Sequence, residues 1–233
     1  MYKKAFARRL KDNKFLVHLW EDSGYSKIEW DNQAYIECNE SEANYKGLNG
    51  EPLKRVKNYR SDNPKLHFHD MPPYQKFLVE KYGVNDTPST THRELFFDIE
   101  CEMLDDMSEE GLKKANKKIT SIAWYDKQVD EWGIVVLDEK NHFGTNIKTK
   151  SNKKIIPCRD EGELLAKFLE IFRDIDPDII VGWNSDYFDI PYLYYRMCNV
   201  LGQDFAKHLS PIGYVRETPW FKDQYIQICG VES

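Results

Sequence analysis

Two acidic side chains stand two residues apart in an apolar stretch, and a third follows about ninety residues later. Asp98 and Glu100 lie in the segment Leu95–Glu100. Because side chains alternate along a strand, both carboxylates are predicted on one face, about 7 Å apart. Two such charges repel each other unless something positive lies between them. The pair therefore indicates either a divalent-cation site or, if it stands alone, a strand end that reaches solvent.

The third acidic residue, Asp189, stands where an apolar run ends and a helix begins. The segment 178–193 runs from a buried strand through a polar loop into this helix. Open α/β sheets bind their ligands at the carboxyl ends of strands, which favours a functional role for Asp189. A helix N-cap is the alternative, because Asp is favoured at that position and Pro191 follows two residues later.

The first ninety residues predict a small β-rich domain. Short strands are expected at 5–10 and 14–20, joined by a hairpin turn at Lys11–Asn13, and again at 27–30 and 33–38. Pro72 and Pro73 begin an apolar-periodic segment that Gly83 ends, which predicts a short helix. Residues 85–91 are the best linker candidate.

Beyond this linker the pattern changes to more apolar strands separated by helices, and residues 91–233 are predicted to form a second domain. Strands are expected at 94–100, 119–125, 132–137 and 179–183, and helices after Asp160 and over 189–201. The segments 104–118 and 138–154 are predicted to be a charged loop and a solvated polar insert. Three strands followed by a helix, a strand and a helix predict an α/β (mixed) fold of the ribonuclease-H-like type.

The two acidic stretches together resemble the proofreading 3′–5′ exonuclease domain of family B DNA polymerases. Phe97–Glu100, F-D-I-E, resembles its first motif, and Asn184–Tyr192, N-x-x-x-F-D-x-P-Y, its second. Ser210–Gly213 and the helix before it are more narrowly similar to polymerases of T-even-type bacteriophages. The resemblance implies that residues 1–90 are the amino-terminal domain and that residues 91–233 are most of the exonuclease domain.

The resemblance also implies a mechanism and a set of site residues. Hydrolysis would use two ions of Mg²⁺ or Mn²⁺, which hard oxygen ligands suit. Asp98 would bridge both ions, Glu100 would hold the ion that carries the attacking water, and Asp189 would bind the second ion. Asn184 and Phe188 match positions that contact the 3′ end of single-stranded DNA. Their alternatives are turn stabilisation for Asn184 and core filling for Phe188.

The sequence departs from the family where a third motif, Y-x-x-x-D, would supply a water-orienting tyrosine and a fourth carboxylate. That motif is absent, as are the palm motifs D-x-x-S-L-Y-P-S and D-T-D. We therefore expect the polymerase active site to be missing from this chain and its nuclease activity to be weak.

A natural split subunit, a truncated chain and an incomplete gene all fit this pattern. The alternative functions are a free-standing exonuclease and a non-catalytic DNA-binding or assembly module of a split polymerase.

Composition limits which further classes of protein fit this sequence. The 33 basic and 39 acidic residues give a net charge of −6, and no apolar run approaches the ~18 residues of a membrane span. The five cysteines are scattered and never form a C-x-x-C pair, which is typical of reduced thiols. We expect a cytoplasmic protein, in the host if phage-encoded, with no membrane partner. Expected partners are primer-template DNA and the remainder of the polymerase. The basic residues of the first sixty positions (Lys3, Lys4, Arg8, Arg9, Lys54, Arg55, Lys57 and Arg60) would either contact template phosphates or form a solvated face.

Overall fold

A computed structural model describes residues 1–47, 49–57, 63–83, 85, 87–89, 92–144, 148–150, 152–220 and 223–232. The chain divides into two compact units, Met1–Thr90 and Thr91–Ser233. Positions 86, 90 and 91 of the predicted linker lie outside the described residues. No described helix has the length and apolar character needed to cross a membrane.

The first unit is built on the predicted hairpin. The strands β1 (Tyr2–Arg9), β2 (Lys14–Glu21) and β3 (Gly24–Asp31) form an antiparallel sheet, and the turn between β1 and β2 holds Asp12 and Asn13 at positive φ. The helix α1 (Pro73–Tyr82) ends at Gly83, as predicted, and packs Phe77 and Leu78 against this sheet. A second sheet has the order β5-β6-β4-β7. Its strands are β4 (Ala34–Glu37), β5 (Tyr45–Lys46), β6 (Pro52–Val56) and β7 (Leu66–His67).

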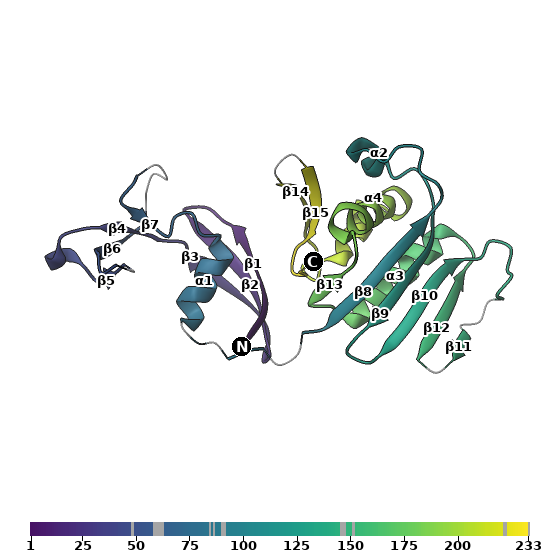
Figure 1. Ribbon diagram of the computed structural model, residues 1–233, viewed down its shortest axis with the longest axis horizontal. Coiled ribbons are helices and arrows are strands. Elements are labelled where there is room, and N and C mark those ends of the chain that lie inside the picture. Colours follow the sequence, from purple (N-terminus) through teal and green to yellow (C-terminus); the bar gives the residue numbers. More distant parts are fainter. Residues whose placement is uncertain are drawn as a thin grey trace. The chain divides into compact units, whose positions relative to one another are not determined.

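The second unit is mixed α/β. Six of its described strands form a sheet in the order β11-β12-β10-β9-β8-β13, in which β8 and β13 run parallel (Figure 1). The sheet consists of β8 (Glu94–Cys101), β9 (Ile119–Asp126), β10 (Glu131–Leu137), β11 (Lys148–Lys150), β12 (Lys153–Cys158) and β13 (Ile179–Val181). A separate hairpin joins β14 (Val215–Trp220) to β15 (Asp223–Ile228).

Helices pack on this sheet through one continuous apolar core. The helix α3 (Glu161–Ile175) contacts β9, β10 and β12, and its Phe168 ring lies 5.8 Å from that of Phe97 on β8. The Asp160 side chain caps this helix by accepting the N–H of Glu163, as predicted. The other described α-helices of this unit are α2 (Glu109–Lys114), α4 (Ile190–Leu201) and α5 (Gln203–Ala206).

Three details differ from the sequence predictions. The predicted charged loop 104–118 contains the helix α2, which the Ser108 side chain caps by accepting the N–H of Gly111. The predicted polar insert contains β11 and the start of β12, because β12 gains backbone hydrogen bonds by pairing parallel to β10. The strand predicted over 179–183 ends at Val181, because the chain leaves the sheet at Gly182. Beyond β13, the backbone of Glu232 pairs with Ile179 on the side away from β8.

Candidate active site

The strand β8 presents different residues on its two faces. Leu95, Phe97 and Ile99 are buried in the core beneath the helices, whereas Asp98 and Glu100 are exposed on the other face. This is the alternation that the sequence predicted. The two carboxylates lie in the carboxyl-terminal half of β8.

The neighbouring strand β13 is too short to cover this half of β8. Its pairing with β8 ends at Val181, opposite Phe96. A strand edge without a partner leaves backbone groups without hydrogen bonds, which is unfavourable when they are buried. The side chain of Asp189 supplies one of these bonds, because its Oδ1 accepts the buried N–H of Ile99 at 3.2 Å. The Asp189 carboxylate, ninety residues away in the sequence, thus takes the place of a sheet partner at Ile99. Ile99 lies between Asp98 and Glu100.

The chain reaches this position through a tight turn and an irregular helix. A Cβ on Gly182 would lie 2.9 Å from Cβ of Ser185 and 3.3 Å from the carbonyl oxygen of Phe97, so this close approach to β8 requires a glycine. A π-helical segment, Ser185–Asp189, follows and leads into α4. Asp189 already has helical dihedral angles, and its side chain makes no capping hydrogen bond. The alternative role of Asp189 as a helix N-cap is therefore wrong.

The surroundings of Asp189 make its negative charge costly. Burial raises the pKa of its carboxyl above the ordinary value of 3.8, the Ile99 N–H opposes this rise, and the charges of Asp98 and Glu100 add to it. Burial also raises the pKa of the Cys101 thiol, and the nearby Glu100, Glu102 and Asp189 raise it further. A thiol in this negative field stays protonated near neutral pH, so Cys101 is a poor nucleophile. The arrangement instead favours binding a cation.

The fit to a metal ion rests on the chemistry of these donors. Carboxylate oxygens are the ligands that Mg²⁺ and Mn²⁺ prefer, and the charges of Asp98 and Glu100 both act on Asp189. The side chains do not already form a closed shell: no group of three or more His, Cys, Asp or Glu in the described residues is gathered tightly enough to hold an ion. The donor types and their shared location fit divalent cations, and the final ligand geometry requires side-chain movement.

Comparison with known proteins identifies the fold and its class. The model of the family described as DNA polymerase family B, exonuclease domain, matches residues 72–225, more than half of the chain. The chain belongs to this family. The exonuclease domain of family B polymerases is ribonuclease-H-like, in agreement with the mixed α/β architecture. Asp98, Glu100 and Asp189 all lie inside the matched region, and residues 1–71 lie outside it.

Individual DNA polymerases are similar to this chain over shorter segments. The DNA-directed DNA polymerase of Escherichia phage RB69 is 38% identical over 86 residues, which is 36% of this chain and 10% of that protein. The enzyme of Enterobacteria phage T4 is 34% identical over 61 residues, 26% of this chain and 7% of that protein. The DNA polymerase of Thermococcus kodakarensis is 28% identical over 141 residues, 60% of this chain and 7% of that protein. The matched segments span about a tenth or less of the length of each of these relatives.

Within this exonuclease domain, the two predicted DNA-contacting residues differ in exposure. Asn184 is exposed, and its carbonyl oxygen accepts the N–H groups of Tyr187 and Phe188, so its backbone stabilises the turn. Phe188 is half-buried, packs on the core and stacks on Tyr192 with ring centroids 5.7 Å apart. Core packing therefore explains part of the role of Phe188.

Two exposed aromatic residues lie next to Asn184 and Phe188 in the sequence, and the sequence alone did not identify them as candidate DNA contacts. Trp183 is 102% exposed and Tyr187 is 51% exposed, so both rings face solvent in the loop that carries Asn184. Trp183 follows an apolar run, which is typical of core or strand-end residues, yet its side chain is exposed. Its place just after the last strand residue, Val181, could have indicated exposure, since the chain must turn there.

The basic residues of the first unit are partly engaged within that unit. Lys54 forms an ion pair with Glu42, and the Arg55 guanidinium lies 5.5 Å from the Tyr45 ring centroid and 5.8 Å from that of Tyr35. Arg8 and Arg9 are both exposed, and position 60 lies outside the described residues. This distribution favours the solvated-face alternative for Lys54.

Proposed function

We propose that this chain is the amino-terminal and proofreading portion of a phage-type family B DNA polymerase, and that it removes 3′-terminal nucleotides from DNA with two Mg²⁺ or Mn²⁺ ions. The observation that carries the proposal is the Asp189 carboxylate. It accepts the Ile99 N–H and lies close enough to Asp98 and Glu100 for both charges to raise its pKa. A buried carboxylate that two neighbouring carboxylates repel is costly when it is charged, and a bound cation would offset this cost.

Each carboxylate has a role in this proposal. Asp98 would bridge the two ions, Glu100 would hold the ion nearest the attacking water, and Asp189 would hold the other. Bound divalent cations lower the pKa of water and stabilise charge on the leaving oxygen, which phosphodiester hydrolysis requires. The Ile99 N–H uses only one lone pair of Asp189 Oδ1, so the carboxylate keeps acceptor capacity for a ligand.

The neighbouring loop offers groups that suit single-stranded DNA. The exposed Asn184 amide can hydrogen-bond the strand, and the exposed part of the half-buried Phe188 ring can pack on a base or sugar. The rings of Trp183 and Tyr187 are exposed enough to stack on bases, a contact that contributes about 1–3 kcal/mol per base. Stacking tolerates any base, as proofreading of a frayed primer end demands.

A cation-dependent digestion assay tests the proposal. The 233-residue chain is incubated with 5′-labelled single-stranded DNA in Mg²⁺ or Mn²⁺, and Mn²⁺ binding is followed by electron paramagnetic resonance. We expect slow shortening from the 3′ end, because the third motif is absent, and loss of both shortening and Mn²⁺ binding in Asp98→Ala. Asp105→Ala is the matched control, since it removes an exposed carboxylate that pairs with Lys117 in the loop after β8.

The outcomes separate the proposal from its alternatives. Equal digestion and Mn²⁺ binding by the parent and Asp98→Ala would refute the site assignment. DNA binding with no cation-dependent digestion, even in a chain extended through a third motif, would support the assembly module. Rapid digestion that the extension does not improve would support a free-standing exonuclease.

A further inference from the structure

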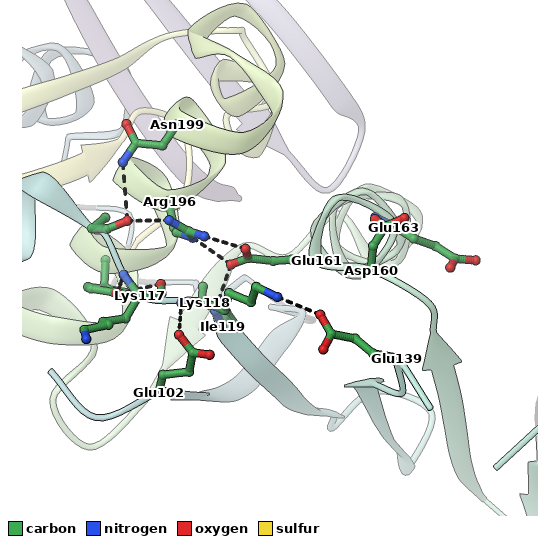
Figure 2. Close-up of polar contacts among 12 residues, drawn as sticks. Glu102, Lys117, Lys118, Ile119, Glu139, Asp160, Glu161, Glu163, Arg196 and Asn199 are labelled. Carbon is green, nitrogen blue, oxygen red and sulfur yellow. Dashed lines mark hydrogen bonds and ion pairs between the residues drawn. The ribbon is translucent and has the colours of Figure 1, made fainter. Parts of the chain in front are cut away.

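A half-buried arginine, Arg196, connects α4 to two other parts of the exonuclease domain. The Arg196 guanidinium donates from Nε to Oε1 of Glu161 at 2.7 Å and from Nη2 to Oε2 at 2.6 Å. Its Nη1 donates to the carbonyl oxygen of Ala115 at 2.8 Å. The side chains of Arg196 and Glu161 are only 13% and 7% exposed. Figure 2 shows Arg196 between the first residue of α3 and the segment that leads into β9.

Two other residues of α4 bind the same segment. Asn199 Nδ2 donates to the carbonyl oxygen of Lys114 at 2.8 Å, and the Tyr192 hydroxyl donates to that of Lys117, also at 2.8 Å. Residues 192, 196 and 199 share one face of a helix because they are four and three positions apart. One face of α4 therefore forms hydrogen bonds with the backbone of residues 114–117 along about two helical turns.

The same carboxylate that pairs with Arg196 also holds the start of β9. Oε1 of Glu161 accepts the buried N–H of Ile119, the first residue of β9. Ile119 pairs with Cys101, at the end of β8 next to Glu100. The Arg196–Glu161 pair thus fixes α4 to the strand that lies beside the one carrying Asp98 and Glu100.

The other end of α4 contacts β8 through Asp189. Asp189 directly precedes the helix and binds the Ile99 N–H on β8. Arg196 stands seven positions after Asp189, about 10 Å further along the helix, so it does not touch the reacting atoms. Core packing and the bonds from Tyr192 and Asn199 already limit the movement of α4, and the Arg196–Glu161 pair adds a charged attachment to α3 and to the start of β9.

We propose that Arg196 and Glu161 are a positioning pair that holds α4 in place and so sets the Asp189 carboxylate against Ile99, between Asp98 and Glu100. The inference rests on the proposed cation-dependent exonuclease. Arginine is required because one guanidinium reaches both Glu161 oxygens and the Ala115 carbonyl at once, whereas a lysine ammonium is a point charge that cannot reproduce this fork. Loss of a residue that orients a metal ligand typically weakens metal binding about 10–100-fold.

The test uses Arg196→Lys and Glu161→Gln in the 233-residue chain. The lysine keeps the positive charge, and the glutamine keeps an oxygen that can accept the Ile119 N–H. The first measurement is hydrogen exchange of the Ile99 amide by NMR without any metal. We expect exchange to accelerate about 10-fold relative to other amides of β8, because Asp189 leaves Ile99 more often. The second measurement is Mn²⁺ affinity by electron paramagnetic resonance, expected to fall about 10-fold.

Arg93→Lys is the matched control. Arg93 binds Asp126, a carboxylate that is 2% exposed, with Nη2 to Oδ2 at 2.6 Å. This pair lies at the start of β8 and the end of β9, which is the end of the strand pair away from Asp98 and Glu100. We expect a similar loss of thermal stability with less than a twofold change in Ile99 exchange and Mn²⁺ affinity.

Three results would overturn or separate the claims. Unchanged Ile99 exchange in both Arg196→Lys and Glu161→Gln would overturn the positioning role, and so would equal changes in Arg93→Lys, since the effect would then be general destabilisation. If Ile99 exchange accelerates as expected but neither the parent nor Asp98→Ala binds Mn²⁺, the positioning of Asp189 stands and the proposed function fails.

Discussion

Replacing Asp189 with asparagine should stabilise the cation-free exonuclease domain while it removes cation binding. Asparagine has nearly the same shape, and its Oδ1 can still accept the Ile99 N–H. What the substitution removes is a negative charge on a residue that is only 4% exposed and that Asp98 and Glu100 both repel.

The size of the effect follows from three contributions. Two unit charges about 6 Å apart repel by about 0.7 kcal/mol in water and about 3 kcal/mol at an effective dielectric constant of 20. Removal of the charge also removes its burial penalty, and weakens the Ile99 hydrogen bond by about 1 kcal/mol, the difference between a charged and a neutral acceptor. Because the net effect raises the pKa of Asp189, the charged form is disfavoured by folding, and we expect a gain on the order of 1 kcal/mol at pH 7.

The pH dependence has a defined sign. A carboxyl whose pKa is raised in the folded state binds its proton more tightly there, so the parent loses stability as the pH rises from 3.8 through the folded pKa. The advantage of Asp189→Asn is therefore largest at neutral pH. It should shrink at low pH, where Asp189 is protonated in both the folded and the unfolded states.

Thermal unfolding with and without Mn²⁺ measures both effects. In EDTA at pH 7 we expect Asp189→Asn to melt about 2–4 °C above the parent, as a gain of about 1 kcal/mol gives in a domain of this size. Mn²⁺ at about 100 times its dissociation constant should stabilise the parent by about 2.7 kcal/mol and the variant far less.

Asp178→Asn is the control, because Asp178 is also buried and its side chain accepts the backbone N–H of Arg93. Asp178 directly precedes β13, at the end of that strand away from Gly182 and Asp189. It should retain the response to Mn²⁺. A melting temperature of Asp189→Asn below that of the parent in EDTA would refute the electrostatic reasoning, and an undiminished response to Mn²⁺ would refute Asp189 as a ligand.

Three further substitutions test the packing and the electrostatics of the two units. Gly133→Ala should destabilise the chain by about 1–3 kcal/mol in urea unfolding, because the new Cβ would lie 1.9 Å from the buried Trp124 ring; an unchanged midpoint would show that the ring can move away. Gly182→Ala should slow DNA shortening more than it lowers stability, because its Cβ would push on the loop that leads to Asp189; normal rates would contradict the need for this close approach. Tyr82→Phe should cost about 1 kcal/mol at pH 7, because the 2.6 Å hydrogen bond from Tyr82 holds the pKa of Glu21 below its ordinary 4.5. This loss should be fully present above about pH 4.5 and fade as the pH falls through the folded pKa, so a constant difference in unfolding free energy from pH 7 to pH 3 would argue against the bond.

Local sequence determined the elements whose signals lie within one or two turns of chain. Pro73 and Gly83 mark the ends of α1, and Asp160 with its following apolar stripe predicts α3. The alternation in β8 placed Asp98 and Glu100 on one face, since a strand has only two faces. These predictions were confirmed because backbone geometry and local capping do not depend on the rest of the fold.

Distant contacts determined what local sequence could not. The helix α2 lies among charged residues, but its end at Ala115, with φ +39, is held by Arg196, 81 residues away. Similarly, β12 begins in a lysine-rich segment that looked solvated, and it is a strand because β10 pairs with it. Strand pairing and long-range side-chain hydrogen bonds of this kind leave little signal in the local sequence.

The site divides in the same way between sequence and tertiary structure. The sequence alone identified which carboxylates are candidates for the proposed chemistry, and it determined that Asp98 and Glu100 share a face, because these depend on residue identity and on the two-residue period of a strand. Only the tertiary structure decided that Asp189 binds the Ile99 N–H instead of capping its own helix. The physical reason is that β13 ends early and leaves the edge of β8 without a partner, so a carboxylate from a distant turn stabilises a buried backbone group there.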